Sequence, residues 1–279
     1  MGTKIKVRKA NGKWEAFDLN RIKKTCYKAG VNKKVADSIA KKVSQQVYNG
    51  ISTRKILKKI QNYLKEYKSS AAAIYSLKSA LMRLGPSGFV FEDYITRLFR
   101  ACGWQATNPE PILGFCISHE VDIILNKKGD YYPVECKYHN KRGIYSGSKD
   151  VLYTWGRFLD LKKGAQFKKN FFNFKKPLLV TNTKFSEQAK QFACCQQIEL
   201  LGWNYPRKSL NFYIHKTKLW PITIIPNLNY NLRFKLFREK IICLEDLFSY
   251  DFKLKYTGIS YQTIKSLQRQ ANEILTAYK

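Results

Sequence analysis

Residues 119–140, HEVDIILNKKGDYYPVECKYHN, constrain this chain more than any other stretch, because they place charged side chains inside two segments that alternate like β-strands. The pattern predicts two strands joined by a tight turn. Side chains alternate between the two faces of a strand, so Glu120 and Asp122 should share one face of the first strand. Glu135 and Lys137 should likewise share one face of the second.

If these strands pair, three carboxylates and a lysine meet at one edge of a short sheet. Such a cluster repels itself unless it holds a cation, and hard oxygen ligands with a neighbouring ammonium are typical of a divalent-metal phosphodiesterase site. The alternative is a surface hairpin in which Lys137 simply pairs with a carboxylate. Against it, Glu135 and Lys137 lie in an otherwise apolar segment that reads as a central strand, where unpaired charge is costly.

The charge balance favours a polyanionic partner. The chain has 51 basic and 20 acidic residues, a net charge of +31, and residues 1–85 alone carry 21 basic against 4 acidic side chains. A uniformly basic surface attracts polyanions, of which nucleic acid is the commonest in a cell. A lysine-rich genome accounts for part of this excess, but not for the scarcity of acid in the first segment.

Length and composition limit the number of domains, the cellular location and the kinds of metal or disulfide site that this chain can have. With 279 residues and 44% hydrophobic content, the chain can bury the cores of two domains or slightly more. We expect no membrane partner, because no apolar run has membrane-spanning length and the N-terminus lacks the apolar core of a signal peptide. Seven cysteines without a CxxC pair and three histidines argue against zinc and disulfides, so a cytoplasmic location is expected.

The first 85 residues predict a β-hairpin followed by helices. The segment IKVRKANGKWEAF alternates on both sides of Asn11-Gly12, a strong hairpin turn signal. Asp18 or Asn20 can cap the helix that follows, and two or three further amphipathic helices extend to residue 85. A basic hairpin beside four helices has the amide-rich, concave form that suits a nucleoside triphosphate.

The ordered segments VRKANGKWEAFDLNRI, YNGISTRKI and AAAIYSLKSALMRL resemble the ATP-cone, the regulatory nucleotide-binding domain of ribonucleotide reductases and some transcriptional repressors. The alternative is a basic helical bundle that binds the DNA backbone and no nucleotide. The resemblance implies a regulatory ATP or dATP ligand that contacts Val7, Arg8, Lys9, Glu15, Asp18, Arg21, Ile22 and Thr53.

Residues 86–210 predict an α/β domain. After the linker at residues 85–88, FVFEDYITRLFRACGW reads as an amphipathic helix with Glu92 in its first turn, where an acid is also favourable without any function. The charged hairpin follows, then a helix, a buried strand within KKPLLVTNT, and a helix capped by Ser186. This order predicts α/β layers around a mixed central sheet.

The pieces GFVFEDYITRLFRACGW, HEVDIIL, VECKYH and LLVTNTKFSEQAKQFA together resemble PD-(D/E)xK nucleases, most closely Mrr-type restriction endonucleases and Holliday-junction resolvases. The resemblance implies a restriction-endonuclease-like fold in which Asp122 and Glu135 ligate Mg²⁺ or Mn²⁺. Lys137 would position the attacking water or stabilise the charged transition state. Glu92 would be an auxiliary acid, and Glu120 would act behind the ligands.

Residues 211–279 predict a connector and two helical segments. Their apolar residues, Leu254 among them, resemble the frame of helix–hairpin–helix DNA-binding units, and a helical cap on the nuclease is an equal alternative. The predicted domains are therefore an ATP-cone at 1–85, a nuclease domain at 86–210 and a mostly helical C-terminal part at 211–279.

Together these patterns predict a magnesium-dependent endonuclease that cuts double-stranded DNA, works as a homo-oligomer of two or more copies, and responds to ATP or dATP. Restriction of foreign DNA fits the resemblance. Two other functions stay open at this point: a junction- or structure-selective repair nuclease, and a non-catalytic, nucleotide-responsive DNA-binding regulator. RNA cleavage is also open.

Overall fold

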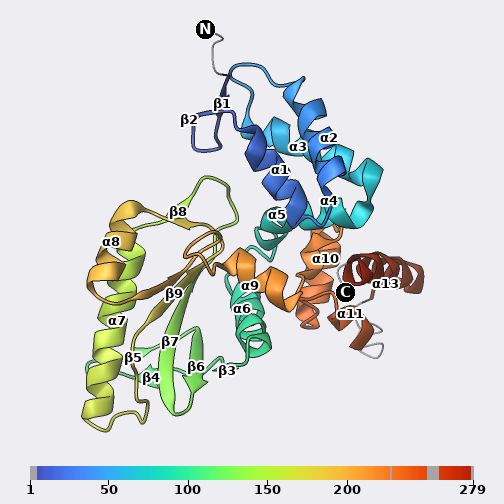
Figure 1. Cartoon of the computed structure of the whole chain (residues 1–279). Coiled ribbons are helices and arrows are strands. Elements are labelled where there is room, and N and C mark those ends of the chain that lie inside the picture. The colour runs from blue at the N-terminus through green and yellow to red at the C-terminus, as the bar shows by residue number, and fades with distance from the viewer. Residues whose placement is uncertain (1–4, 227, 250–257, 278–279) are drawn as a thin grey trace. The chain divides into compact units, whose positions relative to one another are not determined.

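The computed structural model describes residues 5–226, 228–249 and 258–277, and the chain divides into two compact units. One unit joins residues 1–80 to residues 222–279, and the other spans residues 81–221. Figure 1 labels most of the elements of both. The C-terminal segment thus belongs to the same unit as the N-terminal hairpin, whereas the sequence predicted a domain of its own beginning at residue 211.

The first unit opens with the predicted hairpin. Strand β1 (Lys6–Arg8) pairs antiparallel with β2 (Trp14–Ala16), with Val7 opposite Glu15. Gly12 has a φ of 80° in the turn between them, which glycine adopts without strain. The segment before the third helix lies along the other edge of β1, because the Arg8 amide donates to the Ile51 carbonyl at 3.0 Å.

The helices of this unit form where side-chain caps and apolar spacing coincide. Asp18 accepts from the amide of Asn20 at 2.9 Å, and Asn32 and Ser52 cap the next two helices in the same way. Buried residues spaced at three and four, such as Ile56, Ile60 and Leu64, face a shared core. The helices are α1 (Leu19–Lys28), α2 (Lys33–Ser44), α3 (Thr53–Tyr67), α4 (Ser69–Tyr75) and α5 (Leu77–Leu81).

The C-terminal segment is helical, as predicted, and it packs on the end of this bundle. The Thr223 hydroxyl donates to the Ala80 carbonyl at 2.8 Å, and the last helix packs against α4. Leu254 of the predicted helix–hairpin–helix frame lies outside the described residues. The elements are η1 (Ile222–Ile224), α10 (Tyr230–Arg238), α11 (Asp246–Ser249) and α13 (Tyr261–Thr276).

The second unit is a mixed α/β structure around a five-stranded sheet of order β11-β9-β7-β6-β3. Strands β3 (Gln105–Thr107), β6 (Ile123–Lys127) and β7 (Asp130–Lys137) are antiparallel neighbours. Strands β9 (Leu178–Thr181) and β11 (Glu199–Leu201) add in parallel beyond β7. The mixed central sheet predicted from the sequence is therefore present, with β7 as its central strand.

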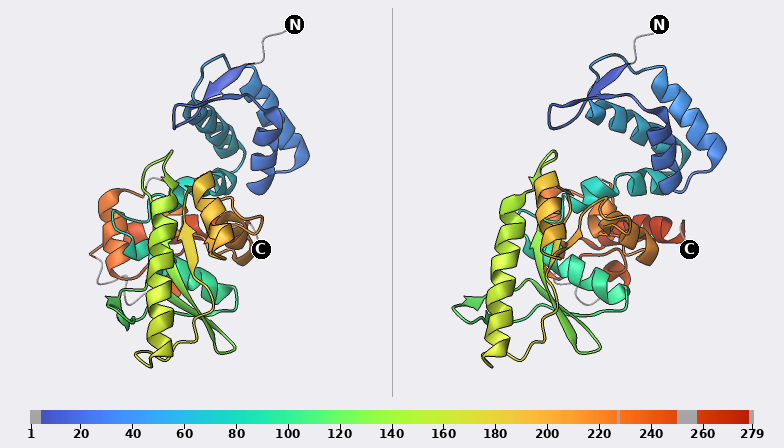
Figure 2. Two further views of the ribbon diagram at one scale, coloured as in Figure 1. Left: turned by 90° about the vertical axis from the view of Figure 1, so that its left-hand side faces the viewer. Right: turned by 60° about the vertical axis from the view of Figure 1, so that its left-hand side comes forward.

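Helices cover both faces of this sheet. In Figures 1 and 2, α7 (Ser148–Gln166) and α8 (Glu187–Cys195) lie on one face, and α6 (Phe89–Ala101) and α9 (Leu210–Thr217) lie on the other. Val151, Leu179 and Ala189 are fully buried between α7, α8 and the strands. Two short pairs flank the sheet: β4 (Ile112–Leu113) with β5 (Ser118–His119), and β8 (Tyr145–Ser146) with β10 (Lys184–Phe185).

The charged hairpin forms as predicted, with one difference at its start. Lys128 and Gly129 both have positive φ, at 56° and 84°, which gives the tight turn between β6 and β7. However, β6 begins only at Ile123, so Glu120 and Asp122 precede it, in an irregular segment. The alternation expected for these two residues therefore does not hold, because a residue outside a strand has no pleat to set its direction.

Candidate functional site

Asp122 and Glu135 are neighbours because of the strand register. The β6–β7 pairing ends with Ile123 opposite Val134, and the next position along each chain holds Asp122 and Glu135. The Cys136 amide donates to Asp122 Oδ2 at 2.7 Å, so a backbone group of the central strand holds this carboxylate in place. The hairpin thus brings together the two acids that the sequence proposed as metal ligands.

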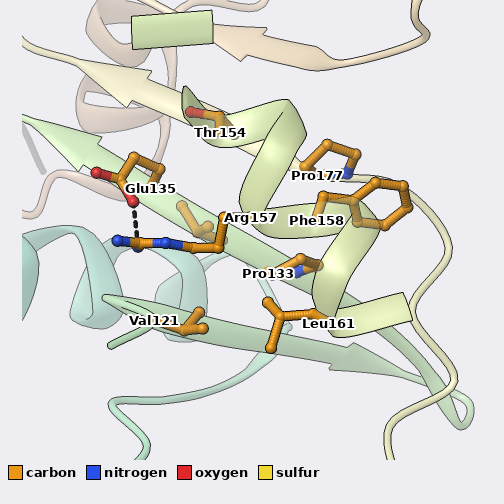
Figure 3. A pocket seen from close by; sticks show the side chains of 9 residues that line it. Val121, Pro133, Glu135, Thr154, Arg157, Phe158, Leu161 and Pro177 are labelled. Carbon is orange, nitrogen blue, oxygen red and sulfur yellow. Dashed lines mark hydrogen bonds and ion pairs between the residues drawn. The ribbon is translucent and has the colours of Figure 1, made fainter. Parts of the chain in front are cut away.

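Glu135 lies deep in the sheet and contacts two cations. Its side chain is 7% exposed, Oε1 accepts from Lys137 Nζ at 2.5 Å, and Oε2 accepts from Arg157 Nη1 at 2.5 Å. Figure 3 shows Arg157 reaching from α7 toward Glu135. Burial of a single charge is costly, and two hydrogen-bonded partners offset that cost.

Glu92 joins these acids from the first turn of α6. Burial, followed by the charges of Asp122, Asp93 and Glu135, raises the pKa of Glu92 to about 7. Its carboxylate turns back over Gly88, where an added Cβ would lie 2.8 Å from Glu92 Oε1. The absence of a side chain at Gly88 leaves room for this conformation. We call Glu92, Asp122 and Glu135 the carboxylate cluster.

The carboxylate cluster carries more negative charge than its surroundings readily hold. Burial raises the pKa of Asp122 to about 6, and the charge of Glu135 adds to this rise, against the Cys136 amide and Arg157, which lower it. Burial lowers the pKa of Lys137, but the hydrogen bond to Glu135 and the charges of Glu135 and Asp122 outweigh burial and leave it raised. Lys137 is therefore a protonated, positively charged neighbour of the cluster.

Arg157 also belongs to this site, although no sequence pattern predicted it. Its side chain is 13% exposed, and its guanidinium lies 4.7 Å from the ring centre of Tyr153, one helical turn earlier on α7. Lys137 Nζ approaches the same ring at 5.3 Å. The spacing of Tyr153 and Arg157 on one helix face is visible in the sequence, but their approach to Glu135 depends on how α7 packs on β7.

A second layer of polar groups holds the end of β7. The Thr181 hydroxyl donates to the Lys137 carbonyl at 2.8 Å. Asn182 exchanges two hydrogen bonds with the backbone of His139, at 2.9 and 2.8 Å. Thr181 and Asn182 are fully buried, which explains the polar residues in the VTNT segment: they fix the backbone next to Lys137.

Glu120 lies apart from this arrangement. It is exposed, and it is not among the charges that raise the pKa of Asp122 or Glu92. The structure therefore brings together Glu92, Asp122, Glu135 and Lys137 without Glu120.

The side chains available as ligands decide whether this site could hold a metal ion. Within residues 5–226, 228–249 and 258–277, no group of three or more His, Cys, Asp and Glu side chains could hold a metal ion. Mg²⁺, however, is commonly held by one or two carboxylates, with water and substrate phosphate completing its shell. Asp122 and Glu135 fit that smaller set, provided that Glu135 exchanges one of its two cation contacts for the metal.

The second candidate site surrounds the N-terminal hairpin. Glu15 on β2 contacts both Lys9 and Arg21, so one carboxylate links the turn of the hairpin to α1. The neighbouring Arg8 is exposed and pairs by a parallel bridge with Ser52, the residue before Thr53. The structure thus brings Lys9 and Arg21 together on Glu15, and it places the Arg8 backbone beside the segment that leads into Thr53.

Three further residues that the resemblance assigns to the nucleotide also have a role in the fold. Val7 and Ile22 are each 5% exposed and belong to the hydrophobic core under the hairpin. Asp18 is the N-cap of α1. A ligand on this face therefore meets charged side chains above a packed apolar base.

Comparisons with known proteins agree with this division of the chain. Residues 5–81 match the ATP cone domain family, and residues 220–275 match the family described as AF1548-like, C-terminal. A protein of Archaeoglobus fulgidus, described only as uncharacterized, is 32% identical over 183 residues, which are 65% of this chain and 99% of the relative. The crystal structure of AF1548, a protein of unknown function, superposes with a TM-score of 0.59 at 30% identity, covering 68% of this chain and 99% of the other.

The comparisons confirm the ATP-cone and name no catalytic activity. The match to the ATP cone domain family supports nucleotide binding by residues 5–81, whereas nuclease chemistry stays a prediction. In the part of the chain that the structure describes, no helix is long and apolar enough to cross a membrane. The chain carries an ATP-cone at residues 5–81, and it belongs to the AF1548-like family.

Proposed function

We propose that this protein is a metal-dependent endonuclease that hydrolyses phosphodiester bonds of DNA, and that nucleotide binding to the ATP-cone controls it. The observation that carries the proposal is the carboxylate cluster with its adjacent ammonium. Asp122 and Glu135 adjoin at the end of the β6–β7 pairing, and Lys137 Nζ lies 2.5 Å from Glu135. The order of α6, the hairpin, α7, β9 and α8 matches that expected from the nuclease resemblance.

The electrostatics of the cluster support a cation. The pKa values of Asp122 and Glu92 rise to about 6 and about 7 because burial and mutual repulsion disfavour their ionised forms. A divalent cation at Asp122 and Glu135 would relieve that repulsion. When bound, Mg²⁺ or Mn²⁺ supplies a water of lowered pKa and neutralises charge on the scissile phosphate.

The side chains of the site have separable roles in this mechanism. Asp122 holds its ligand position through the Cys136 amide, and Glu135 supplies the second carboxylate. Lys137 keeps its proton, so it donates a hydrogen bond to the attacking water or to a phosphate oxygen. Arg157 carries a planar guanidinium that suits phosphate, and its release from Glu135 would free that carboxylate for the metal.

The charge of the chain supports DNA as the substrate. A net charge of +31 provides strong, salt-dependent attraction to the phosphate backbone without selecting a base sequence. Cutting both strands of a duplex requires two sites, so we propose that the active form is a homo-oligomer. ATP or dATP on the cone would then alter assembly or activity, and restriction of foreign DNA is the process that the nuclease resemblance suggests.

The proposal is tested by plasmid cleavage. Wild-type protein, Lys137→Ala and Asp122→Asn are incubated with supercoiled plasmid and Mg²⁺ or Mn²⁺, each with ATP, with dATP and without nucleotide. We expect nicked or linear product with the wild type only. Glu187→Gln is the matched control, because this carboxylate is exposed and pairs with Lys190 on the surface of α8. Equal cleavage by Lys137→Ala would show that the site is wrongly assigned.

One observation favours a second function, a non-catalytic DNA-binding regulator. Both carboxylate oxygens of Glu135 are engaged by Lys137 and Arg157, an arrangement that is stable as it stands. The same experiment separates the two functions. Plasmid binding that responds to nucleotide, without cleavage under any metal condition, would support the regulator and overturn the nuclease.

A further inference from the structure

An exposed surface of phenylalanine and lysine lies at the C-terminal end of α7. It is formed by the last turn of that helix, the loop after it and the loop between β4 and β5. Phe171 is 81% exposed and Phe167 is 58% exposed, although burial would favour both rings. We define the aromatic–lysine surface as Phe115, Lys163, Phe167, Lys168, Lys169 and Phe171.

The rings of this surface form one tilted pair and one stack, and the stack continues inward to Phe172 and Phe174. Phe115 and Phe167 have ring centres 4.7 Å apart. Phe171 stacks on Phe172 at 4.3 Å with an angle of 27° between the ring planes, and Phe172 continues to Phe174 at 5.1 Å. The outermost ring, Phe171, therefore presents a flat apolar face to solvent on top of a supported stack.

Cations surround these rings without neutralising partners. Lys163 Nζ lies 3.9 Å from the ring centre of Phe115, and Lys169 Nζ lies 5.1 Å from it while donating to the Phe115 carbonyl at 2.7 Å. Residues 161–177 contain six lysines and four phenylalanines and no acid. Among the described residues, no carboxylate lies within ion-pair distance of Lys162, Lys163, Lys168 or Lys169.

Hydrogen bonds to Asp160 and a close contact at Gly164 hold the backbone of this surface in place. Asp160 on α7 accepts hydrogen bonds from the amides of Cys116 and Ile117 and from His119, which fixes the loop that carries Phe115. Gly164 allows this loop to touch the helix, because an added Cβ would lie 2.7 Å from the Gly114 carbonyl carbon. A preorganised surface loses little conformational freedom when a ligand binds.

We propose that the aromatic–lysine surface binds single-stranded nucleic acid, with bases stacking on Phe171 and Phe167 and phosphates contacting the lysines. Alternating exposed aromatic rings and unneutralised cations match a strand whose bases and phosphates alternate in the same way. A duplex hides the faces of its bases, so it can use only the lysines. A second copy of this chain is a poor occupant, because its 20 acidic residues are outnumbered by 51 basic ones.

This surface deepens the proposed nuclease function, on which it rests for the choice of a nucleic acid. Arg157 of the candidate site is nine residues before Gln166 on the same helix, which is about 14 Å at 1.5 Å per residue. A substrate with an unpaired strand could therefore contact both regions. The preferred substrate class would be DNA with a single-stranded end or gap rather than an intact duplex.

The test is equilibrium binding with a chelator present, so that no cleavage is needed and failure of the nuclease proposal leaves the result interpretable. The probes are a fluorescently labelled single-stranded DNA oligonucleotide, an RNA of the same sequence and a blunt DNA duplex. Phe171→Ala should weaken single-strand binding about tenfold, through loss of one stacked base, and leave duplex binding unchanged. Tyr261→Ala is the matched control, because Tyr261 is 72% exposed and also lies near a lysine, 5.3 Å from Lys265, but belongs to α13.

A charge variant tests the lysines separately. Lys168→Asn removes one cation at a position with a φ of 57°, a conformation that asparagine tolerates. It should lower the slope of log affinity against log salt for single strands by about 0.7, the value for one phosphate contact. Preference for RNA over DNA would identify the strand as RNA. Unchanged single-strand affinity in Phe171→Ala, or equal losses for single strand and duplex, would overturn the proposal.

Discussion

Replacing Asp122 with asparagine tests whether the carboxylate cluster holds excess negative charge. The unfolded chain releases this proton near pH 3.8, whereas the folded protein releases it at about pH 6. Between these values the folded state binds more protons than the unfolded state, so the free energy of unfolding must fall as pH rises. Asparagine has nearly the same shape and no charge, and it removes this contribution.

The size of the effect follows from the pKa shift. A rise of about two units corresponds to about 3 kcal/mol at 1.36 kcal/mol per unit. About two thirds of it develops between pH 4.5 and pH 7.5, and the partial solvent exposure of Asp122 reduces the expected change to about 1 kcal/mol. Relative to the wild type, Asp122→Asn should therefore become more stable by about 1 kcal/mol over this pH interval.

The assay is urea unfolding of both proteins at pH 4.5, 6.0 and 7.5 with a chelator present. Asp130→Asn is the control, because that carboxylate is 43% exposed on the same hairpin. A repeat with Mg²⁺ at pH 7.5 should stabilise the wild type and not Asp122→Asn. Parallel stability profiles for wild type and Asp122→Asn would refute the reasoning, since the cluster would then carry no uncompensated charge.

Three further predictions concern other parts of the structure. Arg157→Met should lower the free energy of unfolding by about 2–4 kcal/mol, because it leaves Glu135 with Lys137 as its cationic partner. Urea unfolding measures this change, and a loss below about 0.5 kcal/mol would contradict it. Gly164→Ala should destabilise the protein by about 1–3 kcal/mol in urea unfolding, because its added Cβ would overlap the backbone at Gly114. Gly156→Ala should stabilise it by about 0.5–1 kcal/mol, because Gly156 lies in the same helix with open space around it. Equal effects of the two variants would refute the close approach at Gly164. Arg8→Ala should weaken ATP binding, measured by calorimetry, about 10- to 100-fold by loss of a charged hydrogen bond, and unchanged affinity would remove Arg8 from the nucleotide site.

Local patterns in the sequence predicted those parts of the molecule whose structure is local. The hairpin at Asn11-Gly12 and the turn at Gly129 form because glycine adopts positive φ there without strain. Helix caps at Asp18 and Ser52 lie where side-chain oxygen and apolar spacing coincide. The ATP-cone was identifiable for the same reason, since its hairpin and helices follow one another without interruption.

The partners of the charged residues could not be predicted in the same way. The sequence placed Glu120 with Asp122 by alternation, but β6 begins only after both residues. The contact of Arg157 with Glu135 was not predicted, because no sequence pattern shows which strand a helix residue will contact. The aromatic–lysine surface could not be predicted from the sequence either. Phe115 and Phe167 are far apart in the chain, and the close contact at Gly164 brings their rings together.

The sequence by itself determined the positive charge of this protein, its N-terminal cone, the β6–β7 hairpin and the pairing of Asp122 with Glu135. These depend on composition, on turn residues and on a short-range register that one hairpin imposes. Only the tertiary structure decided that Arg157 flanks those acids, and that the C-terminal helices complete the unit of the N-terminal domain. Those arrangements arise when apolar faces of distant elements bury one another, and side-chain packing then sets which charges meet.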